Sequence, residues 1–420
     1  METASHAFFP ILSDQPSPQQ DLLNFNRYAK PIAELIRTPE TQTPLTIGIY
    51  GCWGSGKTTL MELIRSQLPS NDFLHVRFNP WVYRNEENLI VPLLYTIHQE
   101  LKASPLPRFL EAAQRVAVIT LRMAAAFTLK TVSAGAVAIK DIDGELKEYN
   151  KAQKITDGAI GELREELRRT IQGLTSDDHR MVIYVDDLDR CLPGQVVDLL
   201  EAIKLFLDSP NTVVLLAVDP EIVGQGFQAH YRDFKFNDEK QSLLTNDYLD
   251  KMIQLWISLN PLNIVQAHSY LTCLSERIQL RLTSEQTGWL AQAVLPNPRK
   301  IKRVLNGLAL HKRMLAEPPV SDLKLDFELM MRFVLLQQQW PTIYARVRAN
   351  PELIGALCDV IENRKSLSRD ADWVALKTRT PEIVTWCQAA LDYGPHFRAC
   401  LKPSALFSGM NFQPYFEQLG

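Results

Sequence analysis

Cysteine is scarce in this chain of 420 residues, and the few that occur are scattered. The six cysteines form no CxxC pair, and they stand at Cys52, Cys191, Cys273, Cys358, Cys387 and Cys400. The eight histidines show no metal-ligand spacing either. A disulfide framework or a zinc site requires closely patterned Cys or His residues. The sequence therefore argues against both, and a reducing cytoplasm is the expected compartment.

An excess of charge of one sign is also missing. The chain has 45 Lys and Arg against 48 Asp and Glu, which gives a formal charge of −3. A protein that coats nucleic acid through bulk charge needs a strong positive excess. Nucleic acid is therefore not indicated as a partner by net charge, although a local basic face would still allow it.

A long apolar run without charges is the third absence. The nearest approach is VAVITLRMAAAFTLKTVSAGAVAI at residues 116–139, which Arg122 and Lys130 interrupt. A membrane-spanning helix needs roughly 20 predominantly apolar residues with few charges. The N-terminus, METASHAFFPILSD, also lacks the basic start and apolar run of a signal peptide. We expect a buried or amphipathic helical insert here, and no membrane partner.

Short β-branched segments alternate with helical patterns in the first 220 residues. Apolar strand patterns occur at LTIGIY (45–50), HVRF (75–78), MVIYV (181–185) and TVVLLAV (212–218). Helical periodicity separates them, and from about residue 259 the pattern is wholly helical. This alternation predicts an α/β fold with a doubly wound parallel sheet and right-handed crossovers.

A glycine-rich motif follows the first of these strands. GCWGSGKT at residues 51–58 fits GxxxxGK[ST] and opens a helical pattern. Its backbone N–H groups and the helix dipole can surround phosphates, with Lys57 on the β- and γ-phosphates and the Thr58 hydroxyl on Mg²⁺. A chance match occurs in about one chain in 70 of this length, before the flanking strand and helix are required. The predicted nucleotide contacts are Gly51, Cys52, Trp53, Gly54, Ser55, Gly56, Lys57, Thr58 and Thr59.

Acidic residues end two of the predicted strands, where ligands bind in open α/β sheets. Asp186 is the predicted magnesium partner of Thr58, and Asp187 is the predicted residue that orients or deprotonates the attacking water. A solvated acidic turn is the alternative. Arg190 is either an arginine finger or the ion-pair partner of Asp189. Asp219 either senses hydrolysis or caps the helix before Pro220.

Two further segments are open to more than one interpretation. NPRKIKR at residues 297–303 gives a helix a basic start, which opposes the helix dipole. ATP phosphate is the leading candidate for a compensating anion, nucleic-acid backbone is the second, and a solvated face is the third. FNPW at residues 78–81 is interpreted as a packed turn in preference to a base-stacking platform.

Taken together, these motifs resemble the KAP family of P-loop NTPases, within the STAND and AAA-like ATPases. The matching segments extend from residue 21 to about 355, and they are DLLNFNRYAKPIAELI, GCWGSGKTTL, RFNPWVY, VDDLDRC followed by VVDLLEAIKLFLD, LAVDP, DYLDKMIQ, NPRKIKRVLN and QQQWPTIYARVRANPELI. The resemblance implies ATP hydrolysis with Mg²⁺, a sensor role for Arg299 or Arg303, assembly into oligomers or complexes with partner proteins, and roles in defence against phage. Cys52 departs from the proline that is usual in the family. Residues 116–139 lie where some members insert transmembrane helices.

The domain organisation expected from this resemblance has four parts. They are an N-terminal segment with a lead-in helix (1–44), a P-loop core (45–260) with a helical insert at about 102–175, a helical lid (261–315) and a C-terminal helical region (316–420). The leading functional hypothesis is a regulated ATPase that acts as a switch or assembly engine. An ATP-binding interaction or DNA-associated scaffold with little turnover is the second, and a kinase the third. ATP is favoured over GTP because no NKxD motif occurs.

Overall fold

The computed structural model describes most of the chain, in two compact units. One unit contains residues 16–260, and the other contains residues 1–15 with 261–420. The described residues are 10–15, 21–86, 88–103, 107–128, 159–175, 179–230, 247–316, 326–351, 353–361, 392–402, 407 and 412–419. We treat each unit by itself and call the first the nucleotide unit and the second the helical unit.

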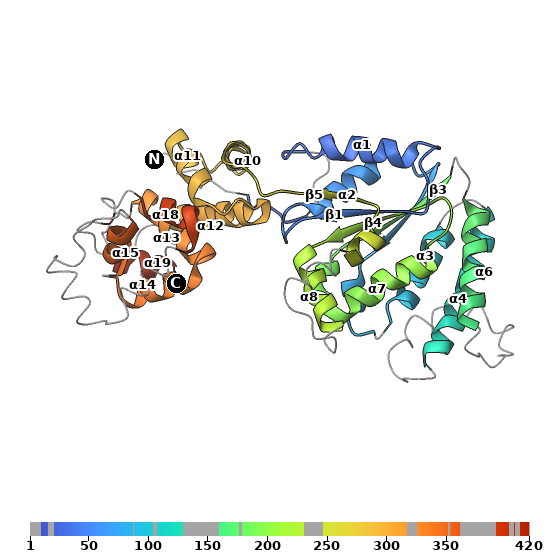
Figure 1. The fold of residues 1–420 in the computed structure, drawn as a ribbon. Coiled ribbons are helices and arrows are strands. Elements are labelled where there is room, and N and C mark those ends of the chain that lie inside the picture. Colours follow the sequence, from blue (N-terminus) through green and yellow to red (C-terminus); the bar gives the residue numbers. More distant parts are fainter. Residues whose placement is uncertain are drawn as a thin grey trace. The chain divides into compact units, whose positions relative to one another are not determined.

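The nucleotide unit alternates strands and helices along the chain (Figure 1). Its elements are α1 (Asn26–Arg37), β1 (Leu45–Tyr50), α2 (Lys57–Ser66), β2 (Phe73–Phe78), η1 (Pro80–Tyr83), α3 (Ile90–Ala103), α4 (Pro107–Thr128), α6 (Ala159–Leu174), β3 (Arg180–Val185), η2 (Leu188–Arg190), α7 (Pro193–Phe206), β4 (Thr212–Val218), α8 (Pro220–His230) and β5 (Leu255–Ser258). The strands form one sheet in the order β2-β3-β4-β1-β5, and every pairing is parallel. The predicted doubly wound parallel sheet is confirmed.

Helices cover both faces of the sheet. Side chains alternate along each strand, so each strand sends apolar residues to both layers. Ile47 and Ile49 point to the face that α1 and α2 cover. Ile183 and Val185 point to the opposite face, under α3, α7 and α8. Figure 1 shows these two helical layers above and below the sheet. Strands buried on both faces have continuous apolar sequences, which is why the strand patterns of residues 181–185 and 212–218 were recognisable.

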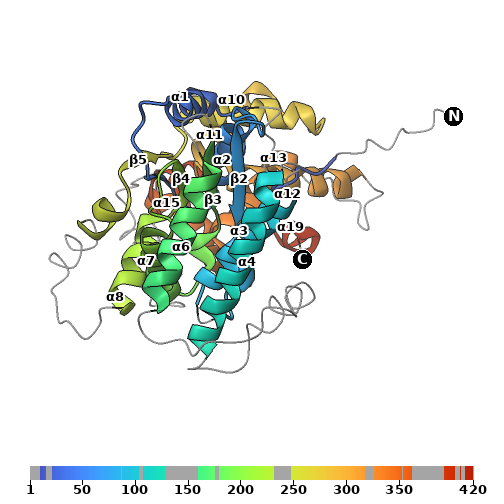
Figure 2. The same cartoon turned by 90° about the vertical axis from the view of Figure 1, so that its right-hand side faces the viewer.

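The insert between β2 and β3 contributes helices to the second layer. Figure 2 shows α3, α4 and α6 side by side, and α4 packs on both of the others. Val116, Ile119 and Met123 of α4 are fully buried in this layer. The segment considered for membrane insertion is therefore helical as far as Thr128 and packs in this layer through residues up to Met123, and residues 129–139 lie outside the described residues. In the described part of the chain, no helix is both long and apolar enough to cross a membrane.

Strand β5 was not predicted from the sequence. It has only four residues and lies at the edge of the sheet, where Leu255 and Trp256 remain exposed. Its short sequence therefore lacks the apolar pattern of a buried strand. It pairs with β1, and immediately after it Leu259 N donates to Tyr50 O over 2.7 Å.

The helical unit is built from helices that pack on sequence neighbours, such as α10 on α11 and α12 on α13, and on distant helices, such as α11 on α18. They are α10 (Ile264–Arg277), α11 (Ser284–Ala293), α12 (Pro298–Ala316), α13 (Phe327–Gln339), α14 (Pro341–Ala349), α15 (Leu353–Ile361), α18 (Gly394–Leu401) and α19 (Gln413–Leu419). Arg332 of α13 is 1% exposed, and it donates to the carbonyl oxygens of Cys400 (2.7 Å) and Lys402 (2.6 Å). It also pairs with Glu328 at 3.1 Å and lies over the Trp289 ring. One buried guanidinium therefore ties α11, α13 and the end of α18 together.

Candidate nucleotide site

The phosphate loop connects β1 to α2 at the carboxyl edge of the sheet. Gly54 and Gly56 have φ angles of 86° and 105°, which L side chains rarely adopt. A Cβ atom on Gly56 would also lie 2.5 Å from the Phe25 ring at the start of α1. Glycine at this position therefore satisfies both the backbone turn and the close approach of the lead-in helix.

Lys57 is 6% exposed although it carries a charge. Its Nζ donates to the carbonyl oxygen of Gly51 at 2.7 Å and to that of Cys52 at 3.4 Å. The hydroxyl of Ser55 is buried and has no hydrogen-bond partner among the described residues. A buried ammonium that donates to two backbone oxygens, next to a hydroxyl without a described partner, suits an arriving phosphate oxygen.

Thr58 and Asp186 meet at the carboxyl ends of β1 and β3. The Thr58 hydroxyl donates a hydrogen bond to the Asp186 carboxylate, and the backbone N–H of Asp187 donates to the same side chain at 2.9 Å. Burial raises the pKa of Asp186 above its ordinary value, while these two hydrogen bonds act in the opposite direction. A desolvated carboxylate beside a hydroxyl is the donor set that a hard divalent cation prefers.

Asp187 has a φ angle of 56°, an uncommon conformation for a residue other than glycine. Both oxygens of its side chain are engaged. Asn79 Nδ2 donates to Oδ2 at 2.9 Å, and Arg190 Nη2 lies 3.0 Å from Oδ1. The observed ion-pair partner of Arg190 is thus Asp187, whereas the ion-pair alternative drawn from the sequence named Asp189; the arginine-finger alternative stays a prediction.

Asn79 is a site residue that sequence reasoning missed. It follows β2, which pairs with β3, so its side chain reaches the acidic strand end from the neighbouring strand. Its Oδ1 accepts from Trp81 N at 3.0 Å, and the Trp81 ring carries Arg84 and Arg190 at 5.1 Å each. The only signal in the sequence was the polar residue directly after a strand pattern.

Asp219 ends β4, next to the phosphate loop. Gly51 N donates to Val218 O at 3.1 Å, which fixes this neighbourhood. Asp219 Oδ1 accepts from Glu221 N at 3.2 Å, the geometry of the helix-cap alternative at the start of α8. A sensing role for Asp219 stays a prediction.

Arg299 and Arg303 belong to α12 in the helical unit. Arg299 Nε lies 3.5 Å from the Asp14 carboxylate of the N-terminal segment. Neither residue belongs to the nucleotide unit, so their sensor role stays a prediction.

The chain matches the sequence model of the KAP family P-loop domain over residues 25–315, which is more than half of its length. The chain belongs to the KAP family. Its motifs therefore form the phosphate loop and acidic strand end of a KAP P-loop nucleotide-binding domain.

Two proteins similar to this KAP chain differ from it greatly in length. The phage T7 exclusion protein of Escherichia coli K12 is 24% identical over 318 residues, which are 69% of this chain and 41% of that protein. The rat kinase D-interacting substrate of 220 kDa is 21% identical over 243 residues, 54% of this chain and 13% of that protein. The chain therefore spans less than half of either relative. Domain III of the replication initiation protein DnaA from Thermotoga maritima covers 79% of this chain, with 97% of its own residues, at 15% identity and a TM-score of 0.38.

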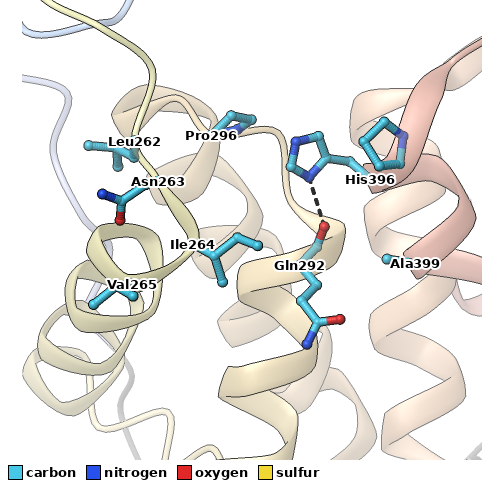
Figure 3. A pocket seen from close by; sticks show the side chains of 9 residues that line it. Leu262, Asn263, Ile264, Val265, Gln292, Pro296, His396 and Ala399 are labelled. Atoms are coloured by element: carbon cyan, nitrogen blue, oxygen red, sulfur yellow. Dashed lines mark hydrogen bonds between the residues drawn. The ribbon is translucent and has the colours of Figure 1, made fainter.

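A separate pocket of about 660 Å³ lies in the helical unit of this KAP protein (Figure 3). It is lined by Leu262, Asn263, Ile264, Val265, Gln292, Pro296, Pro395, His396 and Ala399. His396 Nδ1 is 2.7 Å from Gln292 O, so its ring connects α18 to α11 (Figure 3). The lining is mainly apolar and includes none of the predicted nucleotide contacts, so the phosphate loop remains the candidate functional site.

Proposed function

We propose that this KAP protein is a magnesium-dependent ATPase that works as a nucleotide-driven switch or assembly engine. The observation that carries the proposal is the meeting of Lys57, Thr58, Asp186 and Asp187 at one edge of the sheet. Phosphate binding, metal binding and water activation are three separate tasks, and side chains suited to each adjoin one another here.

Each residue has a defined task in this proposal. Lys57 exchanges its bonds to the Gly51 and Cys52 carbonyls for oxygens of the β- and γ-phosphates. Asp187 accepts a proton from, or orients, the attacking water. Asn79 and Arg190 hold the Asp187 carboxylate in place, and Arg190 neutralises part of its charge.

Magnesium fits the residues that are present. Thr58 and Asp186 would hold it, because their hydroxyl and carboxylate oxygens already adjoin and the carboxylate is desolvated. When bound, it supplies positive charge against the phosphates.

One observation favours a second candidate, an ATP-binding interaction or DNA-associated scaffold with little turnover. Both oxygens of Asp187 are occupied by Asn79 and Arg190. A base held in this way is less available to water. In the switch proposal, movement of Arg190 frees Oδ1 for water, while Asn79 keeps the carboxylate oriented through Oδ2.

The name of the phage T7 exclusion protein supports a role in defence against phage, which we include in the proposal. Assembly into homo-oligomers or with partner proteins belongs to the same proposal. A switch requires several kcal/mol of differential binding between two states, and a γ-phosphate with its cation can supply about that much.

Magnesium-dependent ATP hydrolysis by the purified chain tests this function. Wild type would be compared with Lys57→Ala and Asp187→Asn, each with and without DNA. We expect turnover in wild type only, with ATP affinity lowered roughly 10- to 100-fold in Lys57→Ala and retained in Asp187→Asn. Tight ATP binding by wild type without turnover in either condition would favour the scaffold.

A further inference from the structure

The N-terminal residues 10–15, here called the arm, lie along helix α12. Asn306 contacts both backbone groups of one arm residue. Leu12 N donates to Asn306 Oδ1 at 2.8 Å, and Asn306 Nδ2 donates to Leu12 O at 2.9 Å. The Leu12 side chain is buried at 9% exposure. This pairing resembles one rung of a β-ladder and recognises an extended peptide whatever its side chains.

The next two arm residues contact the preceding turns of α12. Lys302 Nζ donates to Ser13 O at 2.9 Å, and Arg299 lies 3.5 Å from the Asp14 carboxylate. Positions 299, 302 and 306 share one face of a helix, since they are three and four residues apart. The arm therefore runs antiparallel to α12 along a single stripe.

Positive charge gathers around the arm from two helices. Burial lowers the pKa of Lys302, and the positive charges of Arg277 (α10) and Arg299 (α12) lower it further. The Asp14 carboxylate raises it. Among the described residues, the charges that act on Lys302 are thus those of two arginines and one carboxylate. A cluster with this excess favours an acidic ligand.

We propose that the face formed by Arg277, Arg299, Lys302 and Asn306 is a docking surface for an extended acidic peptide of a partner protein, and that the arm occupies it as a built-in competitor. Peptide is favoured over nucleic acid because Asn306 pairs with an N–H and a C=O of the same residue, which a phosphate backbone does not offer. Leu12 and Asp14 define the ligand class, an aliphatic residue followed two positions later by a carboxylate.

Displacement of the arm changes how the two units are connected. The chain crosses from one unit to the other at 15–16 and again at 260–261. While the arm is docked, the units are joined by the chain at both crossings. A partner peptide that replaces the arm leaves only the crossing at 260–261 as a connection. This inference stands on the arm and α12, apart from nucleotide hydrolysis.

Binding of a fluorescent synthetic peptide of residues 10–15 tests the docking surface. The full chain would be used, as wild type and as a released variant with Leu12→Ala and Asp14→Asn. We expect the released variant to bind the peptide at least about tenfold more tightly, because the tethered arm competes at millimolar effective concentration in wild type. Equal affinity in both, or binding in neither, would overturn the proposal.

Two further arms of the experiment identify the ligand. Adding Asn306→Ala to the released variant should weaken peptide binding about tenfold, since two hydrogen bonds are lost, whereas Lys300→Ala, off the stripe on the same helix, should not change it. A single-stranded DNA oligonucleotide that binds the released variant more tightly than the peptide would show a nucleic-acid surface and contradict the peptide assignment.

Discussion

A single amide, Asn79, makes both the turn after β2 and a contact to the acidic strand end. Its oxygen caps η1 and its nitrogen holds Asp187. Asp187 lies in the left-handed region and makes no side-chain cap to its own helical turn. The direction of its carboxylate therefore depends on Asn79 and Arg190, both outside the strand that carries it.

At the residue scale, we predict that Asn79→Ala lowers kcat for ATP roughly 10- to 100-fold and leaves KM nearly unchanged. The substitution misplaces the proposed base without touching the phosphate contacts. Steady-state kinetics would measure it, with Asn71→Ala as the control, since Asn71 is an exposed asparagine of the same unit. A loss confined to KM would contradict the positioning role.

At the scale of elements, the start of α2 depends on a glycine that no other residue replaces well. We predict that Gly56→Ala destabilises the nucleotide unit by about 1–3 kcal/mol, because a positive φ is strained and the new Cβ meets the Phe25 ring. Gly161→Ala is the matched control. A Cβ there meets nothing within 4 Å, so α6 should gain about 0.5–1 kcal/mol.

Denaturant unfolding of both variants would measure these changes in free energy. ATP affinity should fall in Gly56→Ala and stay constant in Gly161→Ala. Equal free energies of unfolding for the two variants would contradict this prediction, because they would mean that the Phe25 ring moves aside without destabilising the unit.

The elements also show what the sequence could and could not predict. Strands β3 and β4 were predictable because both faces are buried and every residue after Arg180 and Thr212 is apolar. Strand β5 was not, because its pairing with β1 leaves Leu255 and Trp256 exposed. The phosphate loop was readable from local spacing, whereas the contacts of Asn79 with Asp187 and of Asn306 with Leu12 join residues 108 and 294 positions apart. Only the folded chain brings such pairs together.

At the scale of the whole molecule, each unit has a core of its own. We predict that Arg332→Lys destabilises the helical unit by about 3 kcal/mol, because lysine keeps the buried charge but lacks the second guanidinium nitrogen, Nη2, that pairs with Glu328 while Nη1 bonds the Cys400 and Lys402 carbonyls. Amide hydrogen exchange in α13 and α18 should become faster, and ATP affinity should not change. Arg348→Lys, an exposed site on α14, is the control. A parallel fall in ATP affinity would show that the two units share their stability.

The hydrogen bond from Leu259 N to Tyr50 O attaches the end of the nucleotide unit to the residue that precedes the phosphate loop. Tyr50 is the last residue before the phosphate loop, and Leu259 is followed by the passage to the helical unit at 260–261. A Cβ on Gly51, the first loop residue, would lie 3.3 Å from the Leu259 Cβ. A movement of Tyr50 would therefore reach the start of the connecting segment through this main-chain hydrogen bond. Because both of its atoms belong to the main chain, this hydrogen bond does not depend on which side chains β5 carries.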